Sequence, residues 1–242
     1  MIEIRALCPG YELRESDDGG RTLFGHFAVF NRWTEIDSFR EGRFLEQIAP
    51  GAFRKTIREN RDRIRALFQH GMDPQIGDKP IADIKELRED EEGVYYEADL
   101  FPGVPELVVD GLRSNQYGAS FRFEPMRAAR NERPELSEHN PEGLPERTLK
   151  EVRLFEFGPV TFPAYAEATS DLRSLTDHFF FEELARHPQE ARALLLEVPE
   201  PSPEDEDDAP AEPDAGTSTS GQARRATRDY LREQEEVQAW RL

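Results

Sequence analysis

The chain has 242 residues and a formal net charge of −19 at pH 7. A protein that grips nucleic acid through its phosphates needs a basic surface, and so does one that docks on an anionic membrane, so this charge argues against both classes. Cys8 is the only cysteine, which excludes an intramolecular disulfide and a thiolate metal cluster. No stretch reaches the roughly 20 apolar residues of a membrane-spanning helix, and the N-terminus lacks the pattern of a secretory signal. We therefore expect a soluble protein of the cytoplasm.

The apolar residues are concentrated before about residue 198. The stretch 199–222 combines acidic residues with proline, glycine, serine and threonine, so we expect a disordered linker there. We expect residues 1–198 to form one folded domain. Residues 223–242 should form a C-terminal helix whose exposed apolar side chains bind a partner. Many strands with few helices indicate an α+β domain built on a strongly bent sheet or barrel.

In the first part of the chain, residues 21–30 (RTLFGHFAVF) crowd β-branched and aromatic side chains into a short run and predict a strand. The turn at 50–51 (Pro-Gly) should lead into a short amphipathic helix. The run 64–70 (IRALFQH) alternates apolar and polar residues, which predicts a strand that ends with His70 at the rim of the core.

Further along the chain, four segments have strand-like composition: 81–87, 93–100, 116–125 and 148–165. The first two should form a hairpin across an acidic turn. Helices are expected at 105–113 and at 177–198. The stretch 129–147 is polar and rich in proline and glutamate, and it predicts a long surface loop.

Ser120 is the candidate nucleophile. It lies in 118–123 (GASFRF), where strand alternation directs Ala119 and Phe121 into the core and Ser120 to the opposite face. The small residues just before the serine leave room for a substrate backbone to approach. The alternative is an ordinary strand serine on a solvated face.

His70 and Glu156 are the candidate base and acid. A partly buried imidazole can stay neutral near pH 7 and accept a proton from a hydroxyl. In strand register Glu156 shares a face with the apolar Val152 and Leu154, where a carboxylate is costly unless it is paired. A histidine partner would satisfy the carboxylate, which would in turn fix the ring tautomer. The alternatives are a rim histidine bound to backbone and a register that leaves Glu156 exposed.

Ser120, His70 and Glu156 supply one member of each type that nucleophilic catalysis needs, because a serine hydroxyl is weak until an oriented base takes its proton. We expect the three residues on three separate strands. The remaining histidines show no spacing suited to a metal site, and the glycines form no phosphate-cradling loop. We therefore expect neither a metal nor a cofactor.

Taken together, these segments resemble the prohead maturation proteases of tailed phages, a family related in fold to the herpesvirus capsid proteases called assemblins. The resemblance runs from about Gly25 to Ala168, through the pieces GHFAVFN, FLEQIAPGAF, RALFQHGMDP, YYEADL, GASFRF and LKEVRLFEFGPVTFPAY. It implies a closed or nearly closed, bent antiparallel β-barrel with flanking helices.

The same resemblance implies a serine endopeptidase with Ser120 as nucleophile, His70 as general base and Glu156 as the third member. Glu151 is the fallback for the acid. The enzyme would act inside the procapsid in the host cytoplasm, on scaffold or on the N-terminal extension of the major capsid protein, and on itself. Because assemblins dimerise, the resemblance also suggests a homodimer.

The chain departs from the family at two places. It has Gly158-Pro159 where a Ser-Val pair is usual, which bears on the backbone beside Glu156. It has Arg122 where a small residue is usual. Backbone N–H groups and Arg122 are the candidates for stabilising the oxyanion.

Two other functions compete with a serine protease. The first is a catalytically inactive scaffold or assembly protein that keeps the barrel. The second is a hydrolase that uses a carboxylate pair, Glu156 with Asp83 or Glu97. A serine-directed probe and a Ser120→Ala variant separate all three.

Overall fold

The computed structural model describes the following residues: 2–7, 11–38, 40–161, 173–177 and 180. The expected linker 199–222 and C-terminal helix 223–242 lie outside the described residues, as does nearly all of the helix expected at 177–198. The domain boundaries therefore stay predictions.

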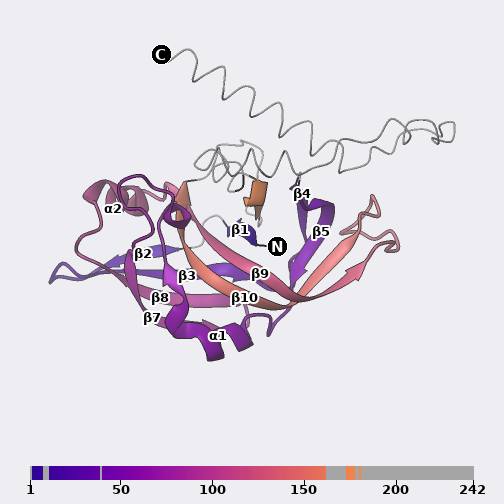
Figure 1. The fold of residues 1–242 in the computed structure, drawn as a ribbon, viewed down its shortest axis with the longest axis horizontal. Helices are drawn as coiled ribbons and strands as arrows, with labels where there is room; N and C mark the ends of the chain where they lie inside the picture. Colours follow the sequence, from indigo (N-terminus) through magenta and orange to yellow (C-terminus); the bar gives the residue numbers. More distant parts are fainter. Residues whose placement is uncertain (1, 8–10, 39, 162–172, 178–179, 181–242) are drawn as a thin grey trace, which may run out of the picture. The chain divides into compact units, whose positions relative to one another are not determined.

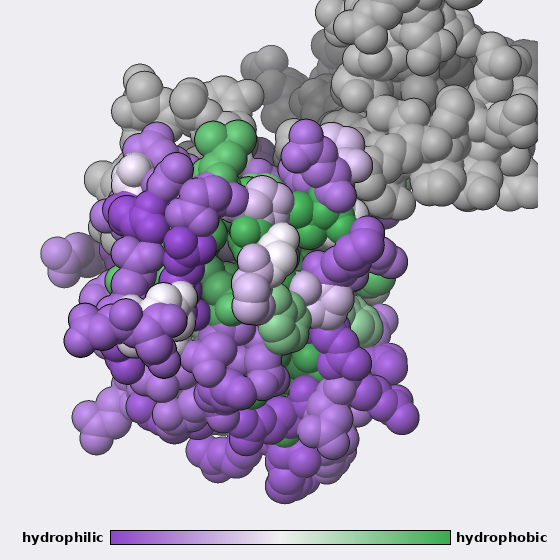
Figure 2. Space-filling model, turned by 90° about the vertical axis from the view of Figure 1, so that its left-hand side faces the viewer, coloured by the Kyte–Doolittle hydropathy of each residue, from purple (hydrophilic) through white to green (hydrophobic). Residues whose placement is uncertain are grey.

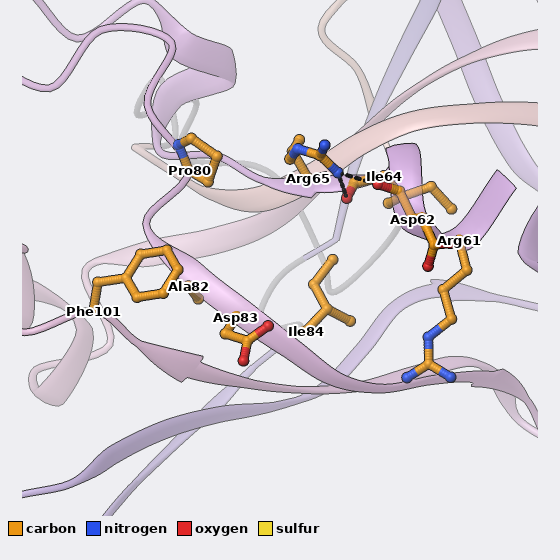
Figure 3. A pocket seen from close by; sticks show the side chains of 9 residues that line it. All are labelled: Arg61, Asp62, Ile64, Arg65, Pro80, Ala82, Asp83, Ile84 and Phe101. Atoms are coloured by element: carbon orange, nitrogen blue, oxygen red, sulfur yellow. Dashed lines mark hydrogen bonds between the residues drawn. The ribbon is translucent and has the colours of Figure 1, made fainter.

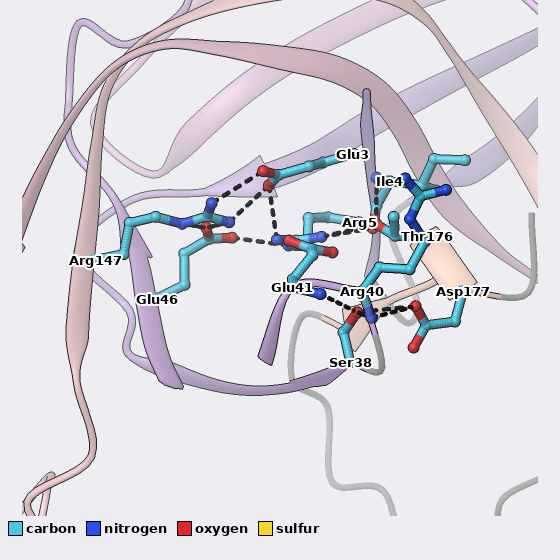
Figure 4. Close-up of polar contacts among 10 residues, drawn as sticks. All are labelled: Glu3, Ile4, Arg5, Ser38, Arg40, Glu41, Glu46, Arg147, Thr176 and Asp177. Carbon is cyan, nitrogen blue, oxygen red and sulfur yellow. Dashed lines mark hydrogen bonds and ion pairs between the residues drawn. The ribbon is translucent and has the colours of Figure 1, made fainter. Parts of the chain in front are cut away.

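The chain divides into two compact units, and the sheet and the candidate site belong to the first. The first unit is Met1–Asp37 with Arg43–Thr176, and the second is Ser38–Gly42 with Asp177–Leu242. In the second unit the Ser38 hydroxyl donates to Asp177 Oδ1 at 2.9 Å, as drawn in Figure 4.

The described secondary structure consists mostly of strands. They are β1 (Glu3–Leu7), β2 (Glu12–Glu15), β3 (Arg21–Val29), β4 (Thr34–Ser38), β5 (Gly42–Ile48), β6 (Arg65–Ala66), β7 (Ala82–Glu89), β8 (Gly93–Leu100), β9 (Tyr117–Asn131), β10 (Glu146–Thr161) and β11 (Arg173–Ser174). The helices are α1 (Arg54–Asn60) and α2 (Glu106–Arg113), with 3₁₀ turns η1 (Arg61–Arg63) and η2 (Gln69–Gly71). The strands and helices expected in the first 161 residues are therefore present, except along 64–70.

The strands form one curled sheet with the order β11-β1-β9-β10-β6-β7-β8-β3-β2, and β5 joins it beside β10 (Figure 1). Strand β10 pairs in parallel with β5 and with β6, whereas β1–β9, β9–β10, β3–β8 and β7–β8 are antiparallel. The expectation of an antiparallel barrel is thus wrong. The sheet is mixed, because long crossovers return the chain to β10 in the direction of β5 and β6. It is also open, since β11 and β2 stand at its two ends. The relation to assemblins stays a prediction.

Strands β9 and β10 form a long curved ribbon through the middle of the sheet (Figure 1). Their register shifts between Leu149 and Glu151, between Glu151 and Val152, and between Leu154 and Glu156. Each irregularity bends the strand and changes which residues face the core. The third shift lies beside the candidate acid.

The core lies on the inner face of this ribbon. Phe27, Phe121 and Phe157 are at most 1% exposed, and the Phe27 and Phe157 rings stack with their centroids 4.7 Å apart. Ala119 is 1% exposed. The alternation predicted for Ala119 and Phe121 is therefore confirmed.

The strand expected at 64–70 is wrong beyond Ala66. After β6 the chain turns through η2, where Gln69, His70 and Gly71 have φ of 50°, 55° and 80°. Ala66, Leu67 and Phe68 are all buried, so the alternation of buried and exposed residues ends where the strand ends. Pattern alone could not separate a strand from this buried turn.

The two helices lie at different parts of the sheet, α1 against β7 and β10 and α2 beside β2 (Figure 1). The turn before α1 contains Gly51 at φ 91°, and Glu89 of β7 accepts the Phe53 backbone N–H at 2.8 Å. Glu106 lies in the first turn of α2 and Arg113 in its last, where each charge complements the helix dipole.

A closed ring of four buried charges ties β1 to β5 and β10 (Figure 4). Arg5 Nε donates to Glu46 Oε1 at 2.8 Å and its Nη2 donates to Glu3 Oε2 at 2.9 Å. Arg147 Nε donates to Glu46 Oε2 at 2.6 Å and its Nη1 donates to Glu3 Oε1 at 2.9 Å. Two arginines and two glutamates, each at most 4% exposed, compensate one another, and this ties β1 to β5 and β10.

Figure 2 shows one face of the molecule, where hydrophilic side chains dominate and hydrophobic ones gather toward the middle and upper part. The large apolar side chains that stay exposed are Ile2, Phe101, Leu107, Met126 and Leu136. None of the described helices is long and apolar enough to cross a bilayer.

Candidate active site

Ser120, His70 and Glu156 form one hydrogen-bonded chain. Ser120 Oγ lies 2.8 Å from His70 Nε2, and His70 Nδ1 lies 2.7 Å from Glu156 Oε1. The side chains of His70 and Glu156 are 7% and 2% exposed, and Ser120 has no exposed surface. The three residues, far apart in sequence, come together from β9, η2 and β10. His70 comes from a turn rather than from the expected strand.

A close contact between main chains delivers His70 to this position. Leu67 N donates to Phe157 O at 2.9 Å, so the segment before the histidine lies directly on β10. Gly158 has no side chain to keep that segment away. In the register of the ribbon Gly158 is also the partner of Ser120. The glycine that departs from the family pattern thus lies where backbone, base and hydroxyl meet.

The register shift between Leu154 and Glu156 sets the direction of the acid. Leu154 pairs with Phe123 and Phe157 with Phe121, so both face the core. Glu156 pairs with Arg122 and therefore faces the same side as Ser120. The expectation that Glu156 shares the face of Leu154 is wrong, because the irregularity interrupts the alternation. The expectation of a buried carboxylate with a histidine partner is met by the geometry.

The Ser120 hydroxyl has two acceptors within reach. Arg5 O, on the neighbouring strand β1, lies 2.9 Å from Ser120 Oγ, and His70 Nε2 lies at 2.8 Å. A hydroxyl carries one proton, so it donates to one of them at a time. Transfer of that proton to the imidazole requires the hydrogen bond from Ser120 Oγ to His70 Nε2.

Gln69 fixes the turn that carries the base, and sequence reasoning missed it. Its Nε2 donates to Thr161 Oγ1 at 2.5 Å, and its Oε1 accepts the Thr161 N–H at 3.2 Å. This pair clamps the turn to the end of β10. Positive φ at Gln69 and His70 is unfavourable for residues with a Cβ, so the turn needs such support.

The other acid candidates lie elsewhere. Glu151, the fallback, pairs with Lys55 at 2.8 Å, and this bond lowers the pKa of Glu151. Asp83 on β7 pairs with Lys85, and Glu97 on β8 accepts a hydrogen bond from the Tyr95 hydroxyl at 2.7 Å. Among these described contacts, neither Asp83 nor Glu97 contacts Glu156. The contacts therefore do not support a hydrolase that uses a carboxylate pair.

Arg122 lies beside Glu156, at the acid end of the hydrogen-bonded line of Ser120, His70 and Glu156. Its Nε is 3.4 Å from Glu156 Oε1, the same oxygen that contacts His70. The guanidinium thus adds a positive charge beside the carboxylate, opposite it in the register of β9 and β10.

A second serine–histidine–glutamate set lies in the loop after β9. Ser137 Oγ is 3.1 Å from His139 Nδ1 and 3.5 Å from its Nε2, and His139 Nε2 is 3.1 Å from Glu146 Oε1. The hydroxyl therefore approaches both ring nitrogens instead of aligning with one. The His139 ring is stacked on Trp33 with centroids 5.1 Å apart, and its side chain is 42% exposed. This arrangement braces a surface loop.

A cleft of about 340 Å³ lies between the segment 61–65 and β7 (Figure 3). Its walls are both apolar and charged, with Ile64, Ile84 and Phe101 beside Asp62 and Asp83. Its lining includes no member of the Ser120–His70–Glu156 chain. In the described part of the protein, no group of three or more His, Cys, Asp or Glu side chains is placed to hold a metal ion.

A hydroxyl, an imidazole and a buried carboxylate in one hydrogen-bonded line are the arrangement that serine hydrolases use. The family model described as Caudovirus prohead serine protease matches residues 10–179, well over half of the chain. The chain belongs to this family of bacteriophage capsid-maturation proteases.

Among solved structures, the bacteriophage T4 capsid assembly protease, gp21, is similar with a TM-score of 0.39 and 16% identity. The match covers 67% of this chain and 97% of that one. No curated protein matches the chain.

Proposed function

We propose that this protein matures the capsid as a serine endopeptidase with Ser120 as nucleophile, His70 as general base and Glu156 as the residue that orients the base. The observation that carries the proposal is the line of contacts at 2.8 Å and 2.7 Å between these three side chains. Membership of the prohead serine protease family supports the same chemistry.

The reaction is acyl transfer. His70 Nε2 takes the Ser120 proton while Oγ attacks a peptide carbonyl carbon, and a tetrahedral intermediate forms. The imidazolium then gives that proton to the leaving amine, which breaks the C–N bond and leaves an acyl-enzyme. Water, activated by the same imidazole, hydrolyses the ester and returns the proton to Ser120. No metal or cofactor enters these steps.

Glu156 contributes by holding the histidine. A carboxylate that accepts the Nδ1–H fixes the tautomer in which Nε2 is the acceptor, and it stabilises the imidazolium that forms during attack. Its burial strengthens this interaction, because little solvent screens it.

The substrates we propose are the scaffold or the N-terminal extension of the major capsid protein, together with the protease itself, inside the procapsid. The description of the family as prohead proteases supports capsid proteins as the substrate class. The homodimer stays a prediction.

The test is co-expression of the full chain with its cognate major capsid protein, followed by intact-mass analysis of both chains. We expect a defined truncation of the capsid protein or of the protease that disappears in Ser120→Ala. The matched control is Ser137→Ala, which removes the hydroxyl of the loop set and should leave the truncation intact. Truncation that survives Ser120→Ala would favour the carboxylate-pair hydrolase.

Labelling by a fluorophosphonate probe tests the nucleophile directly. Assembled wild-type protein should be labelled, while Ser120→Ala and His70→Ala should show on the order of 10⁶-fold slower labelling or none. Absence of labelling in the assembled wild type would favour a catalytically inactive scaffold protein.

A further inference from the structure

The carboxylate of Glu156 is buried with little hydrogen-bond support. The residue is 1% exposed, and its Oε2 accepts no hydrogen bond within the described part of the chain. Oε1 has His70 Nδ1 at 2.7 Å. One hydrogen bond from a neutral imidazole does not compensate a buried negative charge, which is costly unless it is paired.

Arg122 is placed to supply the missing charge. Its Nε lies 3.4 Å from Glu156 Oε1, and its side chain is 26% exposed. A guanidinium stays protonated at any pH at which the protein is folded, so Arg122 keeps its positive charge. The register shift that turns Glu156 away from the core also brings it opposite Arg122, so one backbone feature sets the position of both groups.

Other charged groups also lie on elements packed around the site. Arg65 of β6 is the register partner of Glu156, but its Nη1 donates to the carbonyls of Asp62 and Ile64 at 2.6 and 3.0 Å. Asp78, in the segment after η2, packs its backbone against Gly71.

On β1, the third neighbouring cation also has its own partners. Arg5 lies within the buried ring with Glu3 and Glu46, and it contributes its carbonyl to Ser120. Arg122 is therefore the arginine that faces the acid.

We infer that Arg122 is a positioning residue for the acid of the proposed triad: its guanidinium balances the charge of the Glu156 carboxylate and directs that carboxylate at His70. The inference rests on the proposed function. At rest Arg122 and Glu156 together carry no net charge. The imidazolium that forms during attack then appears beside a neutral pair and not beside an isolated anion.

The charge balance has a consequence that a purely structural role would lack. Without the guanidinium, the Glu156–His70 pair holds one net negative charge in a buried site, so it takes up a proton at higher pH. A pair that has taken up this proton cannot accept another from Ser120. The acidic limb of the pH–rate profile should therefore move to higher pH.

The experiment measures the rate of Ser120 labelling by a fluorophosphonate against pH, on the full chain co-expressed with its capsid protein. Arg122→Gln should shift the acidic limb upward by about one pH unit, with a much smaller change on the plateau. Arg122→Lys, which keeps the charge, should restore most of the limb. Arg122→Met keeps the apolar stem and should reproduce the shift if the Gln variant folds poorly.

Arg153→Gln is the matched control. It removes a positive charge from the same ribbon, but the guanidinium of Arg153 lies 3.9 Å from Glu124 and its side chain is 56% exposed. Its profile should equal that of the wild type. If the wild type is labelled at Ser120 and the acidic limb is unchanged in both Arg122→Gln and Arg122→Met, the inference about Arg122 is overturned while the proposed function stands. A wild type that is never labelled overturns the proposed function instead.

Discussion

Gly158 and Leu67 approach each other so closely that a Cβ on the glycine would lie 1.8 Å from the Leu67 carbonyl oxygen. Real Cβ atoms do not come so near, and the neighbour is backbone, which cannot rotate away as a side chain can. The contact holds the segment that leads to His70 against β10. A side chain at position 158 would push the base away from the hydroxyl that pairs with this position across the ribbon.

Replacement of Gly158 by alanine should therefore impair both folding and chemistry. We expect a lower melting temperature and a labelling rate reduced at least about 100-fold, because a displacement of about 1 Å of a catalytic group has that effect. Thermal denaturation and fluorophosphonate labelling measure the two.

Gly103→Ala is the control for this substitution. A Cβ at Gly103 meets no atom within 4 Å, so this variant should match the wild type in both measurements. Wild-type labelling in Gly158→Ala would show that the close contact does not position His70.

Two of the glutamates of β10, Glu156 and Glu151, should differ sharply in their effect on the reaction. Glu156→Gln keeps the shape of the side chain but lets the amide bind the wrong tautomer, so labelling should fall by about 10⁴-fold. Glu151→Gln breaks an exposed ion pair with Lys55 and should change the rate less than about threefold. Equal losses in both variants would contradict the assignment of the acid.

The sequence predicted the face of Ser120 because β9 alternates regularly there, with Ala119 and Phe121 inside. It selected Glu156 as the candidate acid by an argument that the structure contradicts. Alternation assigns Glu156 to the face of Leu154, but a register shift lies between them, and such an irregularity depends on pairing with β9 that local pattern does not contain.

Two features of the structure could not be predicted from the local sequence. The turn at Gln69 and His70 has positive φ at residues that rarely adopt it, and the clamp from Thr161 and the passage beside Gly158 support it. The buried ring that contains Arg5 joins charges from three strands far apart in sequence. Both depend on tertiary contacts, which override local preference.

The Gln69 clamp should matter for rate more than for stability. Gln69→Ala removes both hydrogen bonds to Thr161 while the turn keeps its unfavourable φ, so we expect labelling about tenfold slower with a small change in melting temperature. Thr161→Val removes the hydroxyl but keeps the N–H and should cost less. A larger effect of the valine variant would contradict this ordering.

The buried ring should dominate stability. Arg147→Met leaves Glu3 and Glu46 buried without one of their two cations, and we expect a loss of about 3–5 kcal/mol in the free energy of unfolding. Arg43→Met breaks exposed pairs with Glu35 and Glu142 and should cost less than about 1 kcal/mol. Urea denaturation of both variants measures the difference, and equal losses would show that the ring contributes no more than a surface pair.

Asp90 should give the protein an acid-sensitive contribution to stability. Burial raises the pKa of Asp90, but hydrogen bonds from the Gly93 N–H and from His26 outweigh it and lower the pKa to about 2, from an ordinary value of 3.8. Because the folded value is the lower one, the ionised carboxylate stabilises the fold above pH 3.8, and this contribution disappears as the pH falls toward 2.

The Asp90→Asn variant isolates the contribution of the Asp90 charge to the free energy of unfolding. We expect the variant to be less stable than the wild type by on the order of 1 kcal/mol near neutral pH, since the site is partly solvated. The difference should shrink steadily between pH 4 and pH 2, the window set by the two values of the Asp90 pKa. Urea denaturation at several pH values measures it. A difference that stays constant through this window would mean that Asp90 stabilises the β7–β8 turn by its shape and hydrogen-bond acceptors alone, without a contribution from its charge.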